Sequence, residues 1–212
     1  RVTGRHTVGF RGPGFSLSPT VLEVLSERGY LYDCSTLPTF IGPFARAYYF
    51  LRSPEMSPDE REKRKKLFGK FSDGFQSLQP SVRSVSDRNI VEIPVTTMPF
   101  LKVPIHVSYL IYLSTFSQAI AKTYWKTAIS ICRTTGVELS LLIHPLDLMS
   151  SDDAPELKFF PGMGISLHKK LGFLDWVISS LTEHYDVVDM RSHAIHVLGR
   201  HVAIQRPQEA PS

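Results

Sequence analysis

Short apolar runs alternate with longer stretches of helical periodicity along the 212 residues of the chain. A short apolar run bounded by turn residues is typical of a buried strand, whereas apolar residues at every third and fourth position predict an amphipathic helix. The pattern predicts about five strands, which are expected at 6–10, 30–34, 89–96, 138–144 and 186–190. Because helical stretches lie between them, we expect a parallel α/β fold.

The helices have recognisable start and stop signals. Ser18 is a favourable N-cap, Pro19 fits the first helical position, and Gly29 is a typical residue just beyond a helix end. Two further helical stretches are expected at 106–135, with a break near 115–117, and at 167–184. The unit strand, helix, glycine, strand at residues 6–34 is typical of a βαβ motif.

The segment 45–88 interrupts this alternation and is interpreted as an insertion into one domain that spans residues 1–204. The remaining residues, 205–212, are polar and proline-containing, and we expect a flexible tail. Within the insertion, residues 57–68 predict a charged helix. Acidic and basic residues are interleaved there, which favours a solvated surface helix; the alternative is a basic lid that attracts an anionic polymer.

Composition limits the function classes. Apolar residues make up 42% of the chain, enough for a core, and the net charge of +4 does not require a nucleic-acid partner, so none is expected. The most apolar stretch, 103–121, is interrupted by polar residues, so no membrane span is predicted. Cys34 and Cys132 are too few for a disulfide framework, which favours a cytoplasmic location without fixing the compartment. Oligomeric state is not encoded in any pattern that we recognise.

The first candidate site follows the first predicted strand, in the sequence Arg11-Gly12-Pro13-Gly14-Phe15. An arginine between a strand and a tight turn is well placed for bidentate binding of a carboxylate. Glycines allow backbone N–H groups to approach a ligand closely, as an oxyanion site requires. The alternative is an ordinary strand-to-helix turn with a solvated arginine.

The second candidate is His144, at the end of the apolar run 138–144. Histidine changes charge near neutral pH and is therefore a common general acid or base. Asp147, three residues later, could orient it; the alternative is a structural histidine. We expect His193 and His196, and the acidic pair Asp152 and Asp153, to be structural. No paired carboxylates follow a predicted strand, and no metal-ligating set is recognised in the chain.

Two of these segments resemble motifs of the polysaccharide deacetylase family, also known as the NodB-homology domain or carbohydrate esterase family 4. Residues 9–16, GFRGPGFS, resemble its third motif, an Arg-x-Pro after a strand, and residues 142–145, LIHP, resemble its fifth, Leu-x-His. Segments 29–35, 91–94 and 159–190 resemble connecting parts of the same domain, so that the resemblance extends over about residues 5–194. It implies a partial, distorted (β/α) barrel with flanking helices.

The resemblance also implies residue roles. A divalent metal, usually zinc, activates water that attacks an N-acyl carbonyl. Arg11 would hold the catalytic base, the Gly14 N–H would stabilise the oxyanion, and His144 would protonate the leaving amine. Leu142 would line the acyl pocket and Asp33 would tune His144; together with Phe15 they complete the predicted substrate-binding set.

The family's first two motifs, an Asp-Asp pair and two histidines, precede the arginine motif and are not found in this sequence. Because the chain begins at Arg1, we interpret it as the C-terminal part of an enzyme whose metal ligands lie elsewhere, and we expect this part alone to be inactive and to expose open sheet edges. The predicted substrate is an N-acylated amino sugar or polysaccharide. The alternatives are a silent glycan-binding or scaffold module, and an amidohydrolase of small non-sugar amides.

Overall fold

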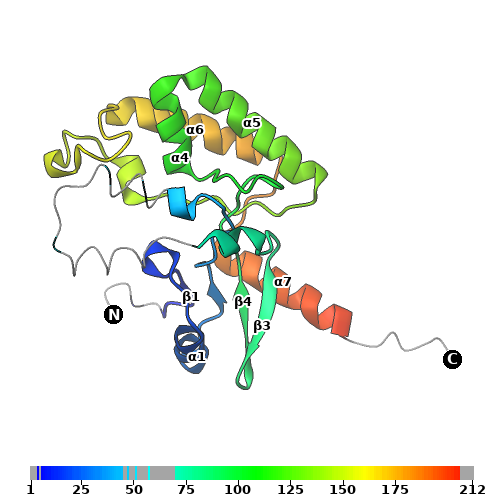
Figure 1. Ribbon diagram of the computed structural model, residues 1–212. Helices are drawn as coiled ribbons and strands as arrows, with labels where there is room; N and C mark the ends of the chain where they lie inside the picture. Colours follow the sequence, from blue (N-terminus) through cyan, green and yellow to red (C-terminus); the bar gives the residue numbers. More distant parts are fainter. Residues whose placement is uncertain are drawn as a thin grey trace.

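The computed structural model describes residues 6–44 and 70–205, together with isolated positions 4, 47, 51 and 57. Its sheet contains four strands in the order β1-β2-β4-β3 (Figure 1). They are β1 (Gly9–Phe10), β2 (Tyr32–Asp33), β3 (Ser81–Val85) and β4 (Arg88–Glu92). The first two and β4 are parallel, and β3 is antiparallel to β4. The mixed α/β class is therefore confirmed, whereas within the described residues the strands form an open sheet and no barrel is seen.

Four of the main helices lie where the sequence predicted helical stretches, and a fifth, α7, was not predicted. Their bounds are α1 (Pro19–Glu27), α4 (Val107–Phe116), α5 (Gln118–Thr134), α6 (Leu167–Thr182) and α7 (Met190–Gln205). The described residues also form four short 3₁₀ turns: η1 (Pro13–Phe15), η2 (Phe71–Phe75), η3 (Pro145–Leu148) and η4 (Pro155–Leu157).

The first βαβ unit forms as its sequence signals predict. The Ser18 side chain accepts a hydrogen bond from the Val21 N–H at 3.2 Å, and Pro19 occupies the first turn of α1. The helix returns the chain to β2, which pairs with β1 in the register Gly9 to Tyr32. Gly9 is required here because a Cβ on it would lie 2.1 Å from the ring of Tyr32.

The strand β3 was not predicted. It lies within 45–88, the segment that was interpreted as an insertion. It is an edge strand of mainly exposed residues that forms a hairpin with β4. Such a strand shows little apolar periodicity, so its sequence resembles a loop. The charged helix predicted within 57–68 lies outside the described residues apart from Ser57. Of the predicted tail 205–212, Gln205 is instead the last residue of a helix, and the remaining residues lie outside the described part.

Two predicted strands are wrong. Residues 138–144 are not part of the sheet; instead the Ser140 N–H donates to the Thr96 hydroxyl at 2.7 Å, and the Leu142 carbonyl accepts from the Val107 N–H at 3.0 Å. The neighbouring segment 94–104 contains Pro94, Pro99 and Pro104. Prolines remove donors that a regular ladder needs, which explains why this apolar run does not become a strand.

Residues 186–189 likewise form no strand, and Met190 begins α7 instead. Asp189 ends the loop and caps the helix, since its carboxylate accepts from the Ser192 N–H at 2.9 Å. The apolar pattern predicted no helix after residue 184. In the structure, Ala194 and Val197 of α7 pack with Cys34, Val91 and Ile93 on the sheet.

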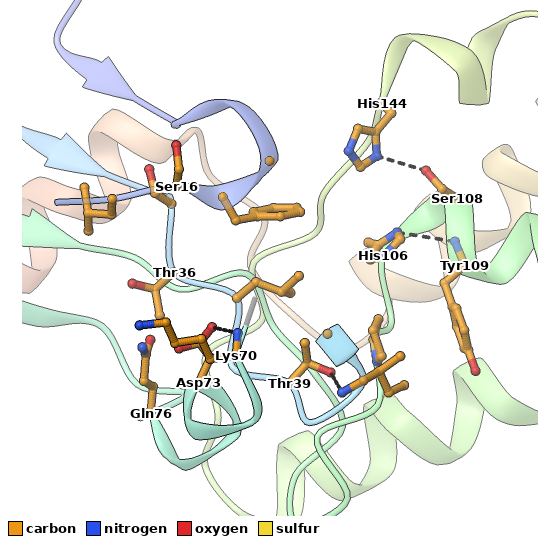
Figure 2. Close-up of a pocket in the computed structure, with 18 of the residues that line it drawn as sticks. Ser16, Thr36, Thr39, Lys70, Asp73, Gln76, His106, Ser108, Tyr109 and His144 are labelled. Atoms are coloured by element: carbon orange, nitrogen blue, oxygen red, sulfur yellow. Dashed lines mark hydrogen bonds between the residues drawn. The ribbon is translucent and has the colours of Figure 1, made fainter. Parts of the chain in front are cut away.

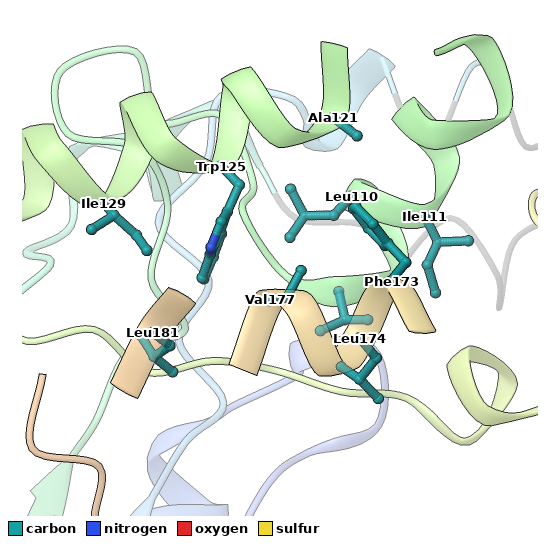
Figure 3. Close-up of a cluster of buried hydrophobic side chains, with 10 residues drawn as sticks. Leu110, Ile111, Ala121, Trp125, Ile129, Phe173, Leu174, Val177 and Leu181 are labelled. Atoms are coloured by element: carbon teal, nitrogen blue, oxygen red, sulfur yellow. The ribbon is translucent and has the colours of Figure 1, made fainter. Parts of the chain in front are cut away.

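A helical layer formed by α4, α5 and α6 packs around the fully buried Trp125 (Figure 3). The predicted break within 106–135 is confirmed at Ser117, whose hydroxyl accepts from the Ile120 N–H at 3.4 Å and so begins α5. This layer lies beside the carboxyl ends of the parallel strands (Figure 1). A functional site is expected at that boundary in open α/β sheets.

Candidate functional site

A cleft of about 1310 Å³ lies between the carboxyl ends of the strands and the helical layer (Figure 2). One wall consists of the η1 turn and the chain after β2, including Gly14, Phe15 and Ser35. The opposite wall consists of the start of α4 and the η3 turn, including Ser108 and His144. The cleft therefore unites the two sequence segments that were predicted to carry chemistry.

The arginine loop is fixed by hydrogen bonds across the strand ends. The Arg11 Nε donates to the Cys34 carbonyl oxygen at 3.0 Å, and the Gly12 N–H donates to the Ser35 hydroxyl at 2.7 Å. A Cβ on Gly12 would lie 2.0 Å from the Ser16 carbonyl oxygen, so the turn needs glycine there. Arg11 is exposed and does not line the cleft, whereas Gly14 and Phe15, both with positive φ, do.

Asp33 supports this loop from beneath. Its carboxylate is fully buried and accepts from both the Ser35 N–H, at 2.8 Å, and the Ser35 hydroxyl, at 2.7 Å. Ser35 in turn holds Gly12, so Asp33 sets the position of the turn that forms the cleft wall. These bonds direct Asp33 to the arginine loop; its role in tuning His144 stays a prediction.

A second carboxylate stands beside Asp33, contrary to the expectation of no paired carboxylates. Glu92 is the register partner of Asp33 and is 3% exposed. Its Oε1 accepts from the Thr36 N–H at 3.2 Å, and its Oε2 lies 3.7 Å from Arg83 Nη2. Burial raises the pKa of Glu92 to about 7, and the charge of Asp33 adds to the rise. In the sequence, Glu92 is the one acidic residue within the apolar run Ile90–Ile93, and this position could have indicated a buried carboxylate.

His144 on the opposite wall is held at both its backbone and its ring. Its backbone N–H donates to the Asp147 carboxylate at 2.8 Å, so Asp147 orients the residue through the main chain. Its Nδ1 lies 2.9 Å from the Ser108 hydroxyl (Figure 2). Pro145 follows directly and begins η3. The ring is thus positioned in the cleft by two elements far apart in sequence.

His106 lies beside His144, with ring centroids 5.8 Å apart. Its Nδ1 accepts from the Tyr109 N–H at 3.3 Å and caps α4. Burial lowers the pKa of His106 to about 4, and the neighbouring His144 lowers it further in the same direction. His106 is therefore neutral at pH 7 and acts as a cap. Neither His106 nor Ser108 was singled out from sequence, although a histidine two residues after Pro104 at a helix start could have been noticed.

Leu142 is 3% exposed and is not among the residues that line the cleft. Its carbonyl connects the segment before His144 to the first turn of α4. The predicted contact of Leu142 with an acyl group stays a prediction.

Lys170 of α6 anchors the η3 turn from below the cleft. It is 2% exposed, and its Nζ donates to the Leu146 carbonyl at 3.0 Å and to the Met149 carbonyl. Burial lowers the pKa of this ammonium group. The lysine thereby attaches the turn that follows His144 to the helical layer.

The described residues do not supply a metal-binding set. No group of three or more His, Cys, Asp or Glu side chains lies close enough together among them to hold a metal ion. The zinc implied by the resemblance was expected to bind residues outside this chain, and the described residues do not fit it. His193, on α7, lies 3.1 Å from the Glu138 carboxylate, which also binds Arg200.

The fold and cleft define the chain as a mixed α/β protein with a cleft at the carboxyl ends of parallel strands. Searches against family models, curated proteins and solved structures find no match to it. In the described part of the chain, no helix has the length and apolar character needed to cross a membrane.

Proposed function

We propose that this chain contributes part of the active site of a hydrolase that removes an N-acyl group, such as acetyl, from an amino sugar or polysaccharide. The observation that carries the proposal is the shared cleft: the glycine turn after β1 and His144 are far apart in the sequence and line the same cavity. This arrangement agrees with the motif resemblance, which was inferred from those same two segments.

Two steps of amide hydrolysis are assigned to residues of this chain. As water adds to the acyl carbonyl, the developing oxyanion accepts a hydrogen bond from the Gly14 backbone N–H. When the carbon–nitrogen bond breaks, the His144 imidazolium donates its proton to the leaving amine. The products are a carboxylic acid and a free amine. Activation of the water is assigned to no residue described here.

The residues that line the cleft support a sugar substrate. Its lining includes Phe15, Tyr109, Tyr112 and Phe160 together with the hydroxyls of Ser16, Thr36 and Ser108. Aromatic rings pack against the apolar faces of sugar rings, while hydroxyls bind their polar edges. The same lining favours a second candidate, a glycan-binding module in which the cleft binds without hydrolysis.

The test compares variants in the full natural protein that contains this chain, with N-acetylated chitooligosaccharides as substrate and acetate release as the readout. His144→Asn should lower kcat about 10²- to 10⁴-fold, the range typical for loss of a general acid. His196→Asn, at an exposed position of α7, is the matched control and should leave turnover unchanged. Full turnover in His144→Asn would contradict the proposal.

Binding separates the two candidates. If the natural protein binds the oligosaccharides in titration calorimetry but releases no acetate, the glycan-binding module replaces the hydrolase. If it neither binds nor hydrolyses them, both candidates fail and a non-sugar amide becomes the next substrate class to assay.

A further inference from the structure

Ser108 occupies the first turn of α4, 36 residues before His144 in the chain, yet the Ser108 Oγ lies 2.9 Å from Nδ1 of the imidazole. We infer that Ser108 is the positioning residue for His144: its Oγ accepts the Nδ1–H, so that proton exchange with a bound substrate takes place at Nε2. The inference rests on the proposed function, because it states how the proton donor of that reaction is held.

The geometry of the ring supports this assignment. The two nitrogens of an imidazole point in nearly opposite directions, so a ring whose Nδ1 faces Ser108 directs its Nε2 away from α4. In Figure 2 the Nδ1 edge of His144 faces Ser108, and the rest of the ring extends into the cleft. Nε2 is therefore the nitrogen available to a bound molecule.

In the bond between Ser108 and His144, Nδ1 is the donor, because the proton that His144 transfers leaves from Nε2. A general acid starts as an imidazolium, which carries N–H groups on both nitrogens. After Nε2 releases its proton, Nδ1 keeps its own, and that N–H needs an acceptor in both states. A serine hydroxyl has lone pairs to accept it throughout.

Neighbouring groups are already occupied with other partners. The Asp147 carboxylate accepts the His144 backbone N–H, and Nδ1 of His106 accepts the Tyr109 N–H. Lys170 donates to carbonyls of the η3 turn. Ser108 is thus the group that the structure places against the His144 ring nitrogen.

The pair is tested by nuclear magnetic resonance on protein with ¹⁵N-labelled histidine, in long-range ¹H–¹⁵N spectra that distinguish the two neutral tautomers. His144→Gln assigns the His144 signals. At a pH where His144 is neutral, the wild-type ring should carry its proton on Nδ1. In Ser108→Ala the ratio of the two tautomers should shift about threefold to tenfold toward Nε2–H, as expected for loss of one hydrogen bond.

Two variants and one internal reference control the result. Ser108→Thr keeps a hydroxyl and should keep the Nδ1–H tautomer. Ser114→Ala removes a serine of the same helix whose hydroxyl donates to the Ile111 carbonyl at 2.7 Å, and should leave His144 unchanged. His106 should carry its proton on Nε2 in every folded variant, because its Nδ1 accepts the helix N–H.

A wild-type His144 in the Nε2–H form, or a tautomer ratio that Ser108→Ala leaves unaltered, would overturn the inference. The readout requires no turnover, so it can fail while acetate release still depends on His144. Conversely, absence of hydrolysis with the expected tautomer would overturn the proposed function and leave the hydrogen-bond assignment in place.

Discussion

Glu92 is a carboxyl group held at the end of a buried strand, where burial and the neighbouring Asp33 raise its pKa to about 7. An unfolded chain releases this proton near pH 4.5. Between these values the folded state binds more protons than the unfolded state. The free energy of unfolding contributed by Glu92 therefore falls as the pH rises from 4.5 to 7.

Glu92→Gln should remove that dependence. Its amide oxygen can still accept from the Thr36 N–H. We expect the variant to gain up to about 3 kcal/mol over the wild type at pH 8, and much less at pH 4.5. Urea denaturation at the two pH values measures the difference.

His106 makes the free energy of unfolding depend on pH in the opposite direction, and comparison of Glu92→Gln with the wild type separates the two effects. The lowered pKa of His106 makes stability fall as the pH drops from 6.5 to 4, and both proteins share this effect. Glu156→Gln, on the exposed η4 turn, is the matched control. An equal stability difference at both pH values would show that folding does not raise the pKa of Glu92.

The residue scale also shows what a linear sequence reveals about a site. Arg11 and His144 were recognised because each follows an apolar run at a turn, which is a local pattern. Ser108 and Glu92 were not, because their significance depends on partners 36 and 59 residues away, His144 and Asp33. The Asp33–Glu92 and Ser108–His144 pairs form only when distant segments fold together, so the linear sequence does not show them.

At the scale of elements, the β1–β2 pair depends on close approach between Gly9 and Tyr32. Gly9→Ala would place a Cβ 2.1 Å from the Tyr32 ring and force the ring out of its position over β1. We expect a loss of about 1–3 kcal/mol in the free energy of unfolding, the usual cost of overpacking. Thermal or urea denaturation measures it.

Gly172→Ala is the matched control for Gly9→Ala, because Gly172 lies in α6 and a Cβ added there would meet open space. Alanine has the higher helix propensity, so this variant should gain about 0.5–1 kcal/mol. If both substitutions change stability equally, the contact with Tyr32 does not explain the need for glycine at position 9.

Elements were predicted correctly where local chemistry decided them. The Ser18 cap and the Ser117 break supply side-chain acceptors to their own helix ends, and such bonds need no distant partner. The strand predicted at 138–144 failed because the neighbouring chain is rich in proline and offers no regular ladder. The helix α7 was missed because its apolar residues are not confined to one face. Ala194 and Val197 pack on the sheet, whereas Ile195, Val202 and Ile204 are exposed.

At the scale of the whole molecule, Lys170 connects the cleft to the helical layer. Lys170→Ala should leave the Leu146 and Met149 carbonyls without their buried donor and release the turn after His144. We expect the free energy of unfolding to fall by about 1–3 kcal/mol, as for other unsatisfied buried groups. Hydrogen exchange should also become faster in residues 145–149.

Lys169→Ala, at the exposed neighbouring position of α6, controls for loss of a positive charge and should change neither measurement. Unchanged exchange at 145–149 in Lys170→Ala would mean that the turn is held independently of this lysine.

The sequence by itself determined the α/β class, the first βαβ unit and the three central helices. It also determined the glycine turn at 12–15 and His144 as candidate parts of the site. Capping, turn chemistry and apolar periodicity act over a few residues, so these features are local. Tertiary structure decided the number and pairing of the strands, the joining of the two walls into one cleft, and the contacts Asp33–Glu92 and Ser108–His144. These features depend on which buried polar groups find partners when distant segments pack together, and a one-dimensional pattern does not contain that information.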